Sequence, residues 1–94
     1  MILATPQHTF AHGNTDITVF HADMGCGLPM HQHTYKHATI CCNGEIAIRL
    51  RGKEVVLGKN SRPVVLPANE EHEIEATQDG TVFINIVANE EDKE

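Results

Sequence analysis

Short runs of β-branched and other apolar residues, each closed by a turn signal, dominate this 94-residue chain. No segment keeps apolar residues at the i, i+3, i+4 and i+7 positions of an amphipathic helix, so helices are not expected. One of the turns is Asn43-Gly44, a dipeptide that is a strong signal for a two-residue β-hairpin. About eight short strands joined by tight turns predict an all-β antiparallel sandwich or barrel.

Alternating side chains give the clearest strand signals. Residues 45–51 place Ile46, Ile48 and Leu50 on one face and polar or charged side chains on the other. Residues 71–75 place His72 and Ile74 on one face in the same way. The other strands are expected at residues 16–21, 30–33, 37–42, 54–57, 64–66 and 81–88. Because there is no internal repeat and no linker, we expect one domain over residues 1–94, with a frayed acidic end at residues 89–94.

The small size of the chain favours self-association. A domain of this length buries only about two-thirds of its unfolded surface, so its core is marginal on its own. Ile40, Cys42 and Val55 or Val56 fall on strand faces that we expect to point outward. Because pairing with a second copy would remove these side chains from water, we predict a homodimer.

Charge and apolar runs argue against several classes of partner. Thirteen acidic and seven basic residues give a net charge of −6, and the basic residues are scattered, so nucleic acid and anionic membranes are not expected partners.

The chain has no apolar window of about 18 residues and no signal-peptide pattern. A disulfide between the adjacent Cys41 and Cys42 would be strained on a strand, which indicates a reducing compartment. We therefore expect a cytoplasmic protein.

The placement of four of the seven histidines predicts a metal site. His31 and His33 lie two apart on an expected strand that follows a Gly-rich turn at Gly25 and Gly27, so both imidazoles project from one face. His37 follows after a short connection, and His72 lies on a distant strand. Neutral imidazole is a common ligand of divalent transition metals. The alternative is that these are ordinary surface or pocket histidines, as we expect for His8, His12 and His21.

The first histidine segment resembles the first motif of the cupin superfamily, Gly-x5-His-x-His-x3/4-Glu-x6-Gly. Gly25 is followed by five residues and then by His31 and His33; three residues later comes His37, and six residues after it Gly44. Each anchor fits except that His37 occupies the position of the motif glutamate.

The second cupin motif, Gly-x5-Pro-x-Gly-x2-His-x3-Asn, is matched in part. Pro67 and His72 are present, whereas Ser61 and Asn69 replace the two glycines and Ala76 replaces the final asparagine. Asparagine tolerates the left-handed backbone conformation nearly as well as glycine, so we expect the turn at Asn69 to be retained. The resemblance covers residues 25–76 and implies an all-β fold, the cupin double-stranded β-helix or jelly-roll barrel.

The resemblance also implies that His31, His33, His37 and His72 bind one divalent transition metal, such as Fe, Zn, Ni, Mn or Cu. With histidine in place of glutamate, four neutral imidazoles would leave a site charge of about +2 rather than about +1. Such a site should favour an anionic ligand such as an enolate.

Four further residues are candidates for the walls of the ligand pocket. Tyr35 lies between the expected ligand strands, and its phenol could reach the mouth of the site. Thr39 and Cys41 share the inward parity of His37, although a buried cysteine is more often a small core residue. Asn85 interrupts an apolar run and points either to the pocket or to solvent.

Three functions fit these expectations. The first is a metal-dependent enzyme, dioxygenase-like or cyclase- or isomerase-like, acting on a small oxyanionic or enolisable molecule. The second is a module that binds a small ligand or a metal without turnover. The third is a small domain stabilised by a metal with a closed coordination sphere.

Overall fold

The computed structural model describes residues 1–89, which form β-strands joined by turns and loops. The strands are β1 (Ile2–Leu3), β2 (Thr5–His12), β3 (Thr15–Ala22), β4 (Cys26–His31), β5 (His37–Asn43), β6 (Glu45–Leu50), β7 (Lys53–Gly58), β8 (Val64–Leu66), β9 (His72–Ala76) and β10 (Thr81–Ala88). Across residues 1–89 there is no helix with the length and hydrophobicity required to cross a membrane. Apart from Asn89, the acidic end expected to fray lies outside the described residues.

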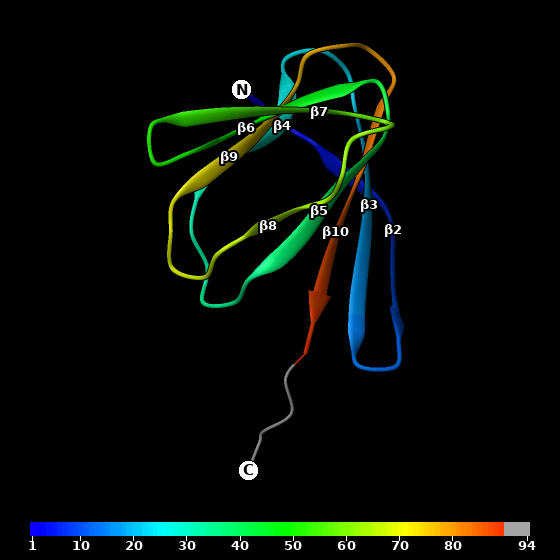
Figure 1. The fold of residues 1–94 in the computed structure, drawn as a ribbon. Coiled ribbons are helices and arrows are strands. Elements are labelled where there is room, and N and C mark those ends of the chain that lie inside the picture. Colours follow the sequence, from blue (N-terminus) through cyan, green and yellow to red (C-terminus); the bar gives the residue numbers. More distant parts are fainter. Residues whose placement is uncertain (90–94) are drawn as a thin grey trace.

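The strands form two five-stranded sheets, in the orders β1-β4-β9-β6-β7 and β2-β3-β10-β5-β8 (Figure 1). We call them the first and the second sheet. All pairings are antiparallel except β1 with β4. Inward side chains of both sheets form one apolar core, in which the rings of Phe20 and Phe83 stack with their centroids 4.9 Å apart. The prediction of an all-β fold is therefore confirmed.

Seven of the eight expected strands are present, with ends that shift by one or two residues, whereas the strand expected at residues 30–33 overlaps β4 only at Met30 and His31. His37, Thr39 and Cys41 of β5 are buried whereas Ala38, Ile40 and Cys42 are less so, which confirms the predicted parity. On β9, His72 and Ile74 are both fully buried, also as predicted.

The sequence did not predict β1 and β2. All eight residues of β2 are exposed, so this strand carries no alternation of buried and exposed positions that a pattern could reveal. It forms because it pairs with β3 along most of its length.

The prediction of a Gly-rich turn at Gly25 and Gly27 is only partly correct. Gly25 has a φ of 88°, which suits a turn, but Gly27 lies inside β4 and pairs with Glu75 of β9. A Cβ atom at Gly27 would lie 2.0 Å from the carbonyl oxygen of Ile74, so only glycine allows β4 and β9 to approach this closely. Since β4 ends at His31, the prediction that His33 lies on the same strand is wrong.

Candidate metal centre

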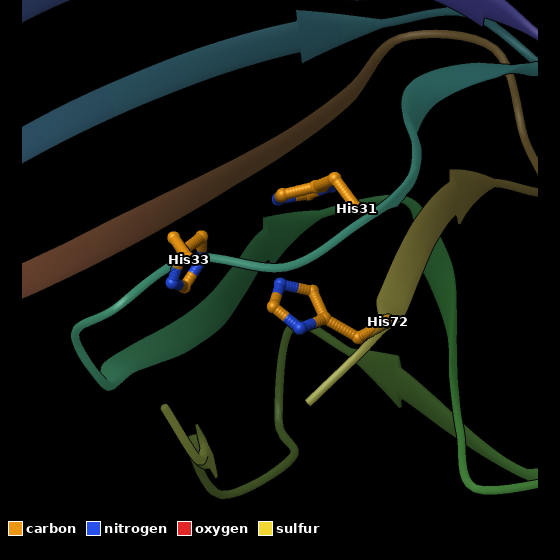
Figure 2. A group of neighbouring side chains, drawn as sticks. All are labelled: His31, His33 and His72. Carbon is orange, nitrogen blue, oxygen red and sulfur yellow. The ribbon is translucent and has the colours of Figure 1, made fainter. Parts of the chain in front are cut away.

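His31, His33 and His72 form one cluster, although they come from distant parts of the chain. His31 ends β4 and pairs in register with His72, the first residue of β9, while His33 lies two residues beyond β4. One ring nitrogen of each histidine lies within 4.8 Å of the corresponding atoms of the other two. Figure 2 shows the three imidazole rings directed toward one another. This spacing is compatible with a shared metal ion.

Backbone carbonyls fix the tautomer of all three rings. Nδ1 of His31 lies 2.7 Å from the carbonyl oxygen of Pro29, Nδ1 of His33 lies 2.7 Å from that of Tyr35, and Nδ1 of His72 lies 3.0 Å from that of Glu70. Because a carbonyl oxygen can only accept, each Nδ1–H must be the donor. In the neutral ring, Nε2 then carries a lone pair that is free to bind a metal.

The Nε2 atom of His72 gives an independent reason to expect a metal. His72 is fully buried, and this nitrogen has no hydrogen-bond partner in the described part of the chain. Burying an unsatisfied polar atom usually costs about 1–3 kcal/mol, so such atoms are rare unless a ligand uses them. A divalent cation bound by the three Nε2 atoms would satisfy the buried nitrogen, so the donor set fits a metal.

His37 lies beside the cluster but outside the group of three. It begins β5, and its ring centroid is 5.0 Å from that of His33 and 5.4 Å from that of His72. The Thr39 hydroxyl donates its single proton to Oδ1 of Asn85 at 2.7 Å, so it accepts a hydrogen bond from Nδ1 of His37 at 3.2 Å. Nε2 of His37 is therefore also free, and its role as a fourth ligand remains a prediction.

Burial keeps the two most enclosed histidines neutral. Desolvation is the largest cause of the lowered pKa of His37, which falls to about 4, and the nearby His33 and His72 lower it further. Desolvation also lowers the pKa of His72. Because metals bind the unprotonated imidazole, low pKa values at His37 and His72 keep both rings in the binding-competent form at neutral pH.

A cavity of about 200 Å³ opens beside the cluster. Its walls include His31, His33 and His37. Tyr35 and Asn85, two of the four residues that the sequence suggested for the pocket, also line it. The ring of Tyr35 stacks on that of His33 with a centroid distance of 4.2 Å and an interplanar angle of 5°.

Thr39 and Cys41, the other two pocket candidates, do not line this cavity within residues 1–89. Thr39 supports His37 and Asn85 through its hydroxyl, as described above. Cys41 belongs to the apolar core, and its thiol donates to the carbonyl oxygen of Asn43 at 3.3 Å. Burial raises the pKa of the Cys41 thiol, so at neutral pH it stays a protonated core residue.

Sequence reasoning missed two polar residues of the cavity wall, Asp16 and Thr18 on β3. Their parity could have indicated them, because both lie on the same strand face as the buried Phe20. A wider cavity of about 820 Å³ adjoins the first and shares Asp16, Thr18 and Tyr35 with it, while Lys36 adds a cation to its wall. His8, His12 and His21 are exposed, as expected.

Comparison with solved structures identifies the fold. KdgF from Halomonas sp. superposes with a TM-score of 0.77 at 18% identity, over 89% of this chain and 78% of that chain. A cupin 2 conserved barrel domain protein from Leptotrichia buccalis gives a TM-score of 0.77 at 23% identity, over 92% of this chain and 41% of that chain. A cupin superfamily protein from Desulfitobacterium hafniense gives 0.73 at 16% identity, over 93% and 83%.

No protein-family model and no curated protein sequence matches the chain. The structural likenesses are nevertheless extensive, and they agree with the motif resemblance over residues 25–76. The chain therefore has the double-stranded β-helix fold of the small bacterial cupins, with a three-histidine cluster that could bind a metal.

Proposed function

We propose that this protein is a metal-dependent enzyme that acts on a small, enolisable, oxyanionic substrate. One observation carries the proposal: three imidazoles present free Nε2 atoms to one another, and that of His72 is buried without a partner. His31 and His33 line the adjoining cavity, about 200 Å³ in volume, so a small molecule in it would lie beside two of the three histidines.

The donor set favours an anionic substrate. Neutral imidazoles add no negative charge, so a divalent ion held by His31, His33 and His72 would keep a local charge of about +2. A bound divalent metal supplies Lewis-acid stabilisation of a carboxylate or enolate oxygen. Lys36 adds a positive charge to the wall of the wider cavity, which shares Asp16, Thr18 and Tyr35 with the smaller one.

The cavity wall favours proton transfer, as in an isomerase or cyclase. The Asp16 carboxylate can accept a proton from a carbon next to a carbonyl, and the Asn85 amide can orient the substrate oxygen. The hydroxyl of Tyr35 can donate a proton at another atom of the same substrate. The carbon–hydrogen bond breaks, the electron pair moves into the enolate, and the proton returns elsewhere, so no oxidant is needed. A dioxygenase reaction is the alternative within the same site.

Deuterium exchange into the methyl group of pyruvate, followed by NMR in heavy water, tests the proposal. We expect the zinc- or cobalt-loaded protein to exchange faster than the free metal. The His72→Ala variant should abolish the effect, and Asp16→Asn should slow exchange without releasing the metal. Metal-dependent oxygen uptake with acetylacetone and no exchange would favour the dioxygenase.

A binding module without turnover is the second candidate. It is favoured by the exposure of Asp16, because a solvated carboxylate is a weaker base than one enclosed with its substrate. In that case pyruvate or acetylacetone would perturb the spectrum of the cobalt-loaded protein, but neither exchange nor oxygen uptake would occur.

A further inference from the structure

A hydrogen-bonded network of three side chains joins His37 to the wall of the smaller cavity. Nδ1 of His37 lies 3.2 Å from the Thr39 hydroxyl, and this hydroxyl lies 2.7 Å from Oδ1 of Asn85. Thr39 is on β5, and Asn85 is its partner on the neighbouring β10 (Figure 1). Asn85 also lines the cavity of about 200 Å³. The network therefore connects a candidate metal ligand to a group that a molecule in the cavity would meet.

The single proton of the Thr39 hydroxyl gives the network a direction. A hydroxyl donates only one hydrogen bond, so it can donate to Asn85 or to His37 but not to both. In the first direction His37 donates from Nδ1 to Thr39, Thr39 donates to Oδ1 of Asn85, and the amide keeps its N–H groups for the cavity. In the reverse direction Thr39 donates to Nδ1 of His37, Asn85 donates to Thr39, and Oδ1 faces the cavity.

Burial couples the two ends of the network. Thr39 is fully buried, so water does not compete for its hydroxyl, and leaving either partner unpaired is costly. Metals bind the unprotonated nitrogen of a neutral imidazole. If that nitrogen is Nε2 of His37, the proton must lie on Nδ1, which selects the first direction. The structure has this arrangement: Oδ1 of Asn85 accepts from Thr39, and within residues 1–89 its Nδ2 has no hydrogen-bond partner.

The orientation of the Asn85 amide matters because the one formal charge in the wall of the smaller cavity is negative. Asp16 lines that cavity, and its carboxylate accepts a hydrogen bond of 3.1 Å from Asn89. The hydroxyls of Thr18 and Tyr35 line it too, but each can rotate to donate or to accept. The Asn85 amide is neutral, so its effect on an anion depends on which of its two ends faces the cavity.

We infer that Asn85 determines the preference of this site for anions, and that Thr39 is the positioning residue that turns its N–H groups to the cavity when His37 binds the metal. The inference rests on the proposed function, since it takes up the anionic ligand proposed there. An azide ion, or the enolate oxygen of a substrate, accepts a hydrogen bond from Nδ2. In the reverse direction the amide oxygen would face the same anion and repel it.

Azide titration of the cobalt-loaded protein, followed by its visible spectrum, tests the inference at cobalt concentrations that saturate every variant. Thr39→Val removes the hydroxyl and should raise the dissociation constant of azide roughly three- to tenfold, as expected for one hydrogen bond. Thr39→Ser keeps the hydroxyl and should bind azide as the wild type does. Thr5→Val, at an exposed position of β2 outside both cavities, is the matched control and should also bind as the wild type.

A double substitution separates positioning from damage to the fold. Asn85→Leu removes the amide and should weaken azide binding by about the same factor as Thr39→Val. If Thr39 acts through Asn85, adding Thr39→Val to this variant should cause no further loss. Losses that multiply would overturn the positioning role. Full azide affinity in Asn85→Leu, or a wild type that does not bind azide, would overturn the inference. Azide binding without deuterium exchange would refute the proposed enzyme and leave the inference standing.

Long-range proton–nitrogen NMR spectra of the zinc-loaded protein provide a second readout that needs no substrate. We expect His37 to be neutral, with its proton on Nδ1, and the amide protons of Asn85 to shift when azide is added. The signals that His37→Gln removes identify the ring. A His37 ring that carries its proton on Nε2 in the zinc-loaded protein would reverse the network and overturn the inference.

Discussion

The backbone amide of Asn69 donates a hydrogen bond of 2.7 Å to the carbonyl oxygen of His33. This bond joins the loop before β9 to the segment after β4, and thus connects the two histidine motifs. Asn69 has a φ of 63°, in the left-handed region, which turns its amide toward His33. Because His33 lies beyond the end of β4, the hydrogen bond from Asn69 helps to hold its imidazole in the cluster.

Substitutions at Asn69 should separate backbone conformation from side-chain chemistry. Asn69→Gly keeps both the amide and the left-handed conformation, so stability should change by less than about 1 kcal/mol. Asn69→Val should cost about 1–2 kcal/mol or more, because a β-branched residue disfavours positive φ, and should weaken metal binding. Urea unfolding and equilibrium dialysis measure the two effects. Asn60→Val, in an exposed turn with ordinary backbone, is the control; equal losses in both valine variants would contradict this account.

Gly27→Ala should damage the fold and the cluster together. The added Cβ would lie 2.0 Å from the backbone oxygen of Ile74, so β4 must move away from β9. We expect a loss of about 2–3 kcal/mol in the free energy of unfolding, and weaker metal binding because these strands carry His31 and His72. Gly58→Ala is the control, since its nearest neighbour would be 3.8 Å away. A Gly27→Ala protein as stable as this control would show that the strands separate without cost.

The metal-free protein should lose stability as the pH falls from about 6.5 to about 4. The folded state holds the pKa of His37 near 4, against an ordinary value of 6.5, so in this window only the unfolded chain binds the proton. Above a pH of about 6.5 the His37 ring is neutral in both states, and its burial carries no cost in protonation. As the pH falls below this value, the free energy of unfolding decreases by up to about 1.4 kcal/mol per pH unit.

Urea unfolding of the EDTA-treated protein across this pH range measures the effect. His37→Gln should show a shallower pH dependence than the wild type, while ordinary carboxylates titrate alike in both proteins. Identical slopes would mean that His37 titrates in the folded chain as it does in the unfolded one.

Loss of any one clustered histidine should remove most of the metal. Alanine at His31, His33 or His72 deletes a donor, so the affinity should fall by more than the roughly 10–100-fold typical of losing a supporting partner. Metal analysis after gel filtration of untagged protein measures the retained ion. His8→Ala, His12→Ala and His21→Ala are the matched controls and should keep it. Full occupancy in His72→Ala would exclude the cluster as the binding site.

The parts of the fold that the sequence predicts are those in which one strand face is buried. On β5 and β9 the buried positions alternate strictly, so spacing of two residues was enough to place His37 and His72 inward. β2 has no buried residue, and its pairing with β3 is therefore invisible to pattern analysis. The closeness of β4 to β9 depends on Gly27, which from sequence alone has the signature of a turn.

The residues of the site could be predicted only in part, because some of them are placed by tertiary contacts rather than by strand alternation. His33 joins the cluster through a loop hydrogen bond to Asn69, not through strand parity. Likewise, the Thr39 hydroxyl lies between His37 and Asn85 only because β5 and β10 pair in the register that sets Thr39 opposite Asn85. Such relationships depend on tertiary register, which local periodicity does not encode.

His37→Glu tests the remaining predicted ligand, at the position where the chain departs from the cupin motif. If His37 reaches the metal, glutamate should replace it as a donor and the variant should keep its metal. The added negative charge should then weaken anionic ligands. At an effective dielectric constant of about 20, a unit charge roughly 4 Å away changes an interaction by up to about 4 kcal/mol before relaxation. A tenth to a half of that value is measurable, so azide should bind the cobalt-loaded variant several-fold more weakly than the wild type.

Asn60→Glu adds the same charge at an exposed turn and should leave azide binding unchanged. If both metal-loaded proteins bind azide equally well, His37 is not a metal ligand, and the preference for anionic substrates must come from His31, His33 and His72 alone.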